Sequence, residues 1–200
     1  MPDALTSVVR ASDPTPRPWV NGAGTTRELA LASAEVGGRP LWRLSLADLP
    51  EVSTFSRIDD VDRIFIVVGA TGVALDFGQR RIRCEQSEPV EFAGEDGPEC
   101  TAAHPTRAFN LMVACGAGVG RVRPHSLDLG EVLSIDARAN LLTAVFVVSG
   151  TGSLDGSALG TGDTAIIDSG TVTFVGSENA KVLHVFVEPT CSGPPEKYAS

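Results

Sequence analysis

The chain has 200 residues, of which 42% are hydrophobic, and a formal net charge of −9, so it can form one large domain or two small ones. Nucleic acid and anionic membranes require a basic face, and this acidic composition therefore argues against both as partners. No run is long enough to span a membrane, the first residues lack the regions of a signal peptide, and the four cysteines are widely spaced without a CxxC pair. These features favour reduced thiols and a cytoplasmic protein.

Short runs of strand length follow one another along the chain, separated by Gly, Pro, Asp and Ser. The strands predicted in the first half are 7–10, 29–34, 41–47, 80–85, 90–92 and 106–114. Those in the second half are 127–133, 142–148, 153–154, 164–168, 171–175 and 182–187. Residues 116–124 are Gly-rich and then basic, which predicts a crossover between the halves, and only 137–141 could form a turn of helix. Regular short strands with turn signals indicate an all-β sandwich or barrel.

One segment occurs twice. Residues 64–76 read Ile-Phe-Ile-Val-Val-Gly-Ala-Thr-Gly-Val-Ala-Leu-Asp, and residues 144–155 read Ala-Val-Phe-Val-Val-Ser-Gly-Thr-Gly-Ser-Leu-Asp. An apolar strand followed by a Gly-rich turn is a common β unit, so chance similarity between two hairpins is the alternative to a true duplication. The repeat predicts one β unit used twice.

The run at 41–47 alternates with the period of a strand, which places Arg43 and Ser45 on one face and the apolar side chains on the other. This polar face lies either in solvent or in a cavity. Asn110 lies within an apolar strand and needs a partner if it is buried. Its counterpart in the second half is His184, which we interpret as a core or surface histidine rather than a functional one.

Two glycines occur close together in residues 19–28, Trp-Val-Asn-Gly-Ala-Gly-Thr-Thr-Arg-Glu, and can form a tight turn near a ligand. A phosphate-binding loop is not indicated, because no Lys-Ser/Thr pair and no helix follow. The three histidines, His104, His125 and His184, are isolated in sequence and include no His-x-His pair. We therefore expect no metal and no other cofactor.

Several motifs resemble the HutD/Ves family in order and approximate spacing, over roughly residues 15–190. They are the segment 19–28, Trp-Arg-Leu-Ser-Leu-Ala-Asp at 42–48, Phe-Ser at 55–56, Asp-Arg at 62–63, Pro-Val-Glu-Phe-Ala-Gly at 89–94 and Phe-Asn-Leu-Met at 109–112. Two positions depart from the family pattern. Ala23 replaces a common Gly, and Ala108 replaces a frequent Asp, so any role of that acid is in doubt here.

The resemblance implies a bicupin, in which two tandem cupin-like (double-stranded β-helix) barrels share one chain. The corresponding expectation is an N-terminal barrel with the ligand pocket at 1–118, a smaller C-terminal barrel at 119–190 and a disordered tail at 191–200. It also implies association with histidine utilisation, with a small anionic metabolite such as N-formylglutamate as ligand and a regulatory role. The oligomeric state is left open, with a homodimer as one alternative.

The pocket residues expected from the motifs and the strand period combine cationic groups with neutral donors and apolar walls. They are Trp19, Asn21, Thr25, Glu28, Arg43, Ser45, Arg63, Asn110 and Met112. A guanidinium binds a carboxylate through two parallel hydrogen bonds, although structural ion pairs are the alternative for each arginine. Two other functions remain open: a metal-independent isomerase, epimerase or hydrolase acting on a small carboxylic acid, and a structural protein whose pocket is a relic. We favour binding over catalysis.

Overall fold

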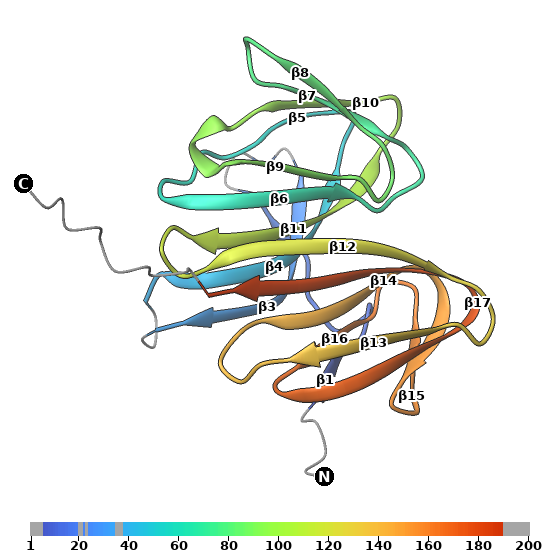
Figure 1. Ribbon diagram of the computed structural model, residues 1–200. Helices are drawn as coiled ribbons and strands as arrows, with labels where there is room; N and C mark the ends of the chain where they lie inside the picture. The colour runs from blue at the N-terminus through green and yellow to red at the C-terminus, as the bar shows by residue number, and fades with distance from the viewer. Residues whose placement is uncertain (1–5, 20–21, 23, 35–37, 190–200) are drawn as a thin grey trace, which may run out of the picture.

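The computed structural model describes residues 6–19, 22, 24–34 and 38–189, and within this part of the chain every regular element except one short 3-10 helix is a strand (Figure 1). The expectation of an all-β protein is confirmed. None of the described helical residues forms a segment long and apolar enough to cross a membrane. The expected tail at 191–200 lies outside the described residues.

The first half contains a six-stranded and a four-stranded antiparallel sheet. The six-stranded sheet has the order β2 (Arg17–Pro18), β3 (Thr25–Ser33), β4 (Pro40–Leu49), β11 (Thr106–Ala114), β6 (Val61–Val67) and β9 (Pro89–Ala93). The four-stranded sheet has the order β5 (Val52–Thr54), β10 (Glu99–Ala102), β7 (Val73–Asp76) and β8 (Arg81–Cys84), and η1 (Gly94–Asp96) follows β9. Buried apolar side chains that include Phe65, Ala108 and Leu75 fill the space between these sheets.

The second half is one seven-stranded antiparallel sheet. Its main order is β1 (Thr6–Val9), β16 (Thr164–Ile167), β14 (Thr143–Leu154), β17 (Gly170–Glu188) and β12 (Val119–Leu127). In addition, β13 (Val132–Ala137) pairs with β17 and β15 (Ser157–Gly160) pairs with β14. One face of this sheet encloses its own apolar core, with Val145, Val182 and Phe174 among the members.

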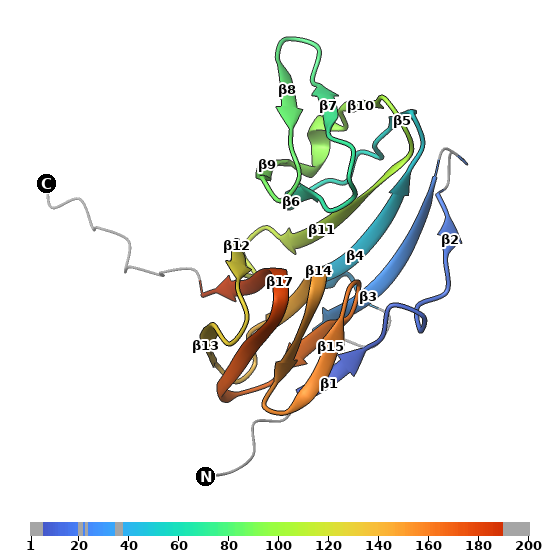
Figure 2. The ribbon, with the colours of Figure 1, turned by 90° about the vertical axis from the view of Figure 1, so that its right-hand side faces the viewer.

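The two halves share a third core. In both ribbon views the six-stranded sheet lies between the four-stranded sheet and the second half (Figure 2). Alternate residues of its central strands, such as Leu44 and Leu111, face the second half and pack in one cluster with Phe146 and Leu183. The residues between them face the first-half core, as the strand period requires.

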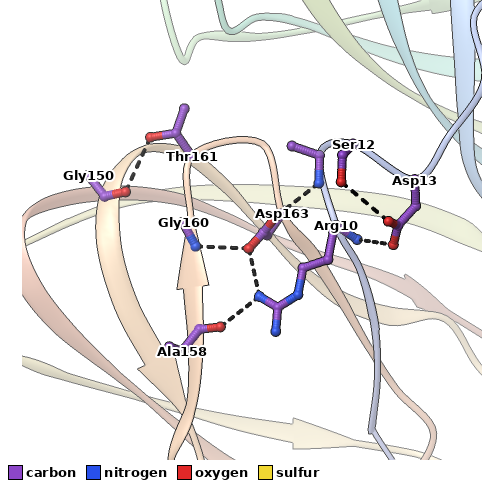
Figure 3. A network of polar contacts seen from close by, with 9 residues as sticks. Arg10, Ser12, Asp13, Gly150, Ala158, Gly160, Thr161 and Asp163 are labelled. Carbon is purple, nitrogen blue, oxygen red and sulfur yellow. Dashed lines mark hydrogen bonds and ion pairs between the residues drawn. The ribbon is translucent and has the colours of Figure 1, made fainter.

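Strand β1 belongs to the sheet of the second half although it begins the described chain. Asp163 fixes the segment that follows β1 by accepting hydrogen bonds from Arg10 Nη1 at 2.8 Å, Ala11 N at 2.9 Å and Gly160 N at 3.0 Å (Figure 3). A domain boundary at residue 118 therefore assigns β1 to the N-terminal half, although β1 is a strand of the second-half sheet.

Three local predictions were wrong. The predicted strand at 127–133 is interrupted at 128–131 by a turn between β12 and β13, in which Glu131 N donates to Asp128 O at 3.1 Å. Most of the expected crossover at 116–124 is strand β12, whose nine residues pair with β17, and 138–141 is a turn without helix. Gly, Arg and Pro in 116–124 suggested a crossover rather than a strand, yet β12 packs closely against the first half at Gly120. A Cβ there would lie 2.9 Å from Leu111 Cδ2 and 3.1 Å from Val113 Cγ2.

Candidate functional site

A cavity of about 310 Å³ opens on the face of the six-stranded sheet that is directed toward the first-half core. This volume is at the small end of the range for ligand pockets. Its lining comprises Arg17, Pro18, Trp19, Thr26, Glu28, Arg43, Ser45, Ala47, Leu49, Phe55, Ser56, Ile58, Arg63, Asn110 and Met112.

Strand register brings the polar residues together. Met112 on β11 is opposite both Arg63 on β6 and Arg43 on β4, so the two arginines flank it. Two residues earlier, Asn110 is opposite Ser45, and Ser45 is in turn opposite Glu28 on β3. Residues opposite each other or two apart on a strand project from the same face. Four strands thus contribute to one polar patch within an otherwise apolar interior.

Arg63 is a buried cation with no carboxylate partner among the described residues. Its Nη2 donates to Asn110 Oδ1 at 3.0 Å, its Nε has no hydrogen-bond partner, and its guanidinium carbon lies 5.0 Å from the ring centre of Phe55. A second ring, Phe92, lies 5.1 Å away. Burial, together with the charge of Arg43, lowers the pKa of Arg63 to about 10, so the side chain is still charged at neutral pH.

The positive charge of Arg43 is only partly neutralised by a nearby carboxylate. Its Nε lies 3.6 Å from Glu28 Oε2, which is too far for a hydrogen bond, and that Nε is buried without a partner. A carboxylate on a ligand could therefore accept hydrogen bonds from Arg43 or Arg63 without first breaking a well-formed internal one.

Trp19 forms one wall of the cavity. Its Nε1 donates to Thr26 Oγ1 at 2.6 Å, and its ring meets Phe55 edge-on with the ring centres 6.1 Å apart. Gly24 lies beneath the indole, where a Cβ would approach the ring to 3.2 Å and Asp48 O to 2.8 Å. The Gly-rich segment thus lets the tryptophan pack closely on the sheet.

Seven of the nine residues predicted for the pocket line this cavity: Trp19, Glu28, Arg43, Ser45, Arg63, Asn110 and Met112. Asn21 lies outside the described residues. Thr25 does not line the cavity, because it is opposite Asp48 and donates to Asp48 Oδ2 at 2.8 Å on the other face of the sheet. Thr25 and Glu28 are three residues apart and cannot share a strand face unless a bulge intervenes between them.

Sequence reasoning missed Thr26, whose position two residues before Glu28 is the signal that could have identified it. It also missed Phe55 and Phe92, which enclose the guanidinium of Arg63. Phe55 lies outside the strands, and Phe92, in the predicted strand 90–92, is opposite Arg63 once β9 pairs with β6. Arg17, Pro18 and Ile58 reach the cavity from an edge strand and a loop, and no sequence signal placed them there.

The polar part of the described lining consists mainly of cationic and neutral side chains. Among the described residues around the cavity, Glu28 is the one carboxylate, and there is no histidine or cysteine. No group of three or more His, Cys, Asp or Glu side chains within the described chain could hold a metal ion. Three arginines, a buried amide and aromatic side chains thus surround the cavity.

Fold and site define an all-β protein of the cupin type with a small cationic pocket. The fold is shared with YhhW from Escherichia coli, at a TM-score of 0.69 and 10% identity over 92% of this chain and 98% of that one. A sequence model described as HutD matches residues 11–184, and the chain belongs to the HutD family.

Individual relatives agree with this assignment. A protein from Pseudomonas putida, described as an uncharacterized 21.2 kDa protein in the hutC 3′ region, is 34% identical over 109 residues, which are 54% of this chain and 57% of that protein. HutD from Pseudomonas fluorescens SBW25, solved in a formate condition, has a TM-score of 0.72 and 25% identity over 92% and 98% of the two chains. A conserved protein of unknown function from Pseudomonas aeruginosa PAO1 has a TM-score of 0.76 and 27% identity over 92% and 100%. The family is thereby linked to histidine-utilisation genes.

Proposed function

We propose that this protein binds a small carboxylate metabolite in the first-half cavity and serves a regulatory role in histidine utilisation. The observation that carries the proposal is Arg63, which is buried, charged and without a carboxylate partner in the described chain. A buried charge is costly unless it is paired. A ligand carboxylate at the free edge of this guanidinium would supply the missing partner.

The chemistry of the wall favours a short acid with a second polar group. Arg43 offers a second cation, while Ser45 and Asn110 offer neutral partners beside it. N-formylglutamate, with two carboxylates and a formamide group, fits this description, and formate represents a single carboxylate alone. The formate condition of the P. fluorescens HutD structure agrees with a carboxylate ligand. A role in sensing rather than turnover fits the described part of the lining, in which Glu28, already near Arg43, is the one carboxylate and no His, Cys, Lys or Tyr is present.

A thermal-shift series at constant ionic strength tests the ligand class. We expect N-formylglutamate or formate to raise the Tm by about 5–10 °C at a hundredfold excess over Kd, with no effect of the neutral analogue formamide. Equal shifts from formamide, or no shift from any of these acids, would refute a carboxylate receptor. Following N-formylglutamate by NMR in the same samples distinguishes binding from turnover, because an enzyme would consume it.

A further inference from the structure

The second half contains a set of cationic and imidazole side chains at positions that correspond to the first-half pocket. In the first half, β11 lies between β4 and β6, and Asn110 is opposite Ser45 and Phe65. In the second half, β17 lies between β12 and β14, and His184 is opposite Arg123 and Val145. The strand order and the register therefore place His184 where the first half has Asn110.

The neighbouring positions extend this correspondence. Arg121 is opposite Phe186, as Arg43 is opposite Met112, and His125 is opposite Val182. Leu127 and Val182 belong to the apolar core of the second half, so the strand period places the residues two and four positions away on the same face of the sheet. His125, His184 and Phe186 are half-buried on this face, and Arg123 is exposed. We call Arg121, Arg123, His125, His184 and Phe186 the β12–β17 cluster.

Both imidazoles have an unsatisfied nitrogen. The Nε2 atoms of His125 and His184 are buried and have no hydrogen-bond partner. The ring centres lie 6.3 Å apart, and Phe186 covers His184 with its ring centre at 4.8 Å. Buried polar atoms are usually hydrogen-bonded, so two unpartnered nitrogens in one cluster indicate a ligand position.

Of the two arginines of the cluster, Arg121 pairs with a carboxylate, whereas Arg123 has no such partner among the described residues. Arg121 Nε lies 3.3 Å from Glu188 Oε2, which parallels the loose pair of Arg43 and Glu28. Arg123 forms no ion pair within the described chain, and its guanidinium carbon lies 4.9 Å from the ring centre of Phe186. One cation is thus held over an aromatic ring and is free to bind an anion.

An anion fits this cluster better than a metal. Burial first, then the charges of His125 and Arg123, lower the pKa of His184 to about 4, so its imidazole is neutral at pH 7 and can donate one N–H. Burial and Arg123 also lower the pKa of His125. The two histidines have no third metal-ligating side chain within the described residues, and a guanidinium beside them would repel a cation.

We propose that the β12–β17 cluster is a second anion site, which binds a small oxyanion, carboxylate or phosphate, through Arg123 and the Nε2–H groups of His125 and His184. It is independent of the first-half pocket, since it uses other strands and a different face of the molecule. The second half would then also be a ligand-binding unit rather than only a support for the first half.

The three histidines of the chain make a direct test possible by NMR of the imidazole nitrogens. The probes are inorganic phosphate and acetate, titrated against chloride at constant ionic strength. We expect saturable shifts of the His125 and His184 signals, while His104, which is exposed, stays unchanged and serves as an internal reference. No saturable shift of either signal up to about 50 mM, which would mean a Kd far weaker than the millimolar range, would overturn the proposal.

Variants assign the response to the cluster. Arg123→Gln should weaken binding at least about tenfold, the loss expected for a charged hydrogen-bonding partner, and Arg63→Met should leave these signals responsive. The matched control is Arg138→Gln, which removes the same charge from an exposed position in the second half. If Arg123→Gln does not fold by circular dichroism, His125→Gln provides the same test. Unchanged affinity in a folded cluster variant, or loss of the response in Arg63→Met, would contradict a separate second site.

Discussion

At the scale of single residues, the central feature is a cation buried without its counter-ion. Arg63 is 6% exposed and is held by one hydrogen bond and two aromatic rings. Such a group reduces the stability of the unliganded fold, because desolvation of the charge is not offset by a carboxylate. A side chain that lowers the folding stability and is nevertheless held in a fixed position by its neighbours is typical of a binding site.

Replacement of Arg63 by Met should therefore leave the unliganded protein about as stable as the parent. Loss of the desolvated charge is favourable, whereas Asn110 Oδ1 loses its donor at a cost of about 1–3 kcal/mol. We expect a change in unfolding free energy within about 2 kcal/mol by urea denaturation. A loss above about 4 kcal/mol, which would match the removal of one partner from a buried pair, would show that Arg63 is primarily structural.

Asp163 gives a prediction on pH at the same scale. Burial alone would raise its pKa, but hydrogen bonds from Gly160 N and Ala11 N and the contact with Arg10 lower the pKa below its ordinary value. The stability it contributes is therefore fully present above about pH 4 and is lost as the pH falls through the lower folded-state pKa.

We expect Asp163→Asn to lower the unfolding free energy at pH 7 by roughly 2–3 kcal/mol, or about 4–10 °C in Tm. The difference between parent and variant should shrink as the pH is lowered from 5 to about 2, because the parent loses the charge as well. Thermal unfolding across this pH range measures it, with Asp168→Asn as a control at an exposed site. A difference that is independent of pH would contradict the role assigned to the ionised carboxylate.

At the scale of elements, the strand period explains which site residues could be predicted. Arg43 with Ser45, and Asn110 with Met112, are pairs two residues apart, and their strands are regular enough for the face to be assigned from sequence. Thr25 was misplaced because the start of β3 follows a Gly-rich segment, which left its face unassigned before the pairing with β4 was known. Phe55 reaches Arg63 through long-range packing and Phe92 through the pairing of β9 with β6, and no local pattern encodes either contact.

Strand β12 was missed because long-range pairing, rather than its local sequence, determines its structure. Its composition of Gly, Arg, Pro and His has low strand propensity, and its pairing with nine residues of β17 overrides that preference. Tertiary contact thus decided the structure of this segment. At the interface with the first half, a side chain at Gly120 would have to displace the ends of Leu111 and Val113.

Gly120→Val should consequently destabilise the protein by about 1–3 kcal/mol, the usual cost of overpacking a core. The control is Gly160→Ala, also in a strand, where an added Cβ would meet nothing within 4 Å. Chemical denaturation of both variants tests the difference. Equal stability of Gly120→Val and the parent would mean that β12 does not pack against the first half as described.

At the scale of the whole molecule, the two halves are not separable units. The shared core joins Leu44, Leu111 and Ile64 from the first half to Phe146 and Leu183 from the second. In addition, β1 completes the second sheet from the other end of the chain. Duplication of a β unit, suggested by the repeat at 64–76 and 144–155, is thus compatible with one cooperative fold.

A fragment of residues 1–118 should accordingly fail to form a stable monomer, because its face of the shared core would be exposed to water. We expect aggregation, or a spectrum without dispersed amide signals, when it is expressed alone. Co-expression with residues 119–200 should improve its solubility. A monomeric 1–118 fragment with dispersed signals and cooperative unfolding would contradict the shared core.

The most direct test of the account is calorimetry of N-formylglutamate and formate with the parent protein, Arg63→Met and the charge-matched control Arg138→Gln. We expect the parent and Arg138→Gln to bind at least one of these acids with equal affinity, and Arg63→Met to bind it at least about thirtyfold more weakly, since removal of one charged partner of a buried pair costs on the order of 2–5 kcal/mol. Equal affinity of parent and folded Arg63→Met would contradict the central claim that Arg63 receives the carboxylate, and absence of binding to the parent would contradict the proposed ligand class.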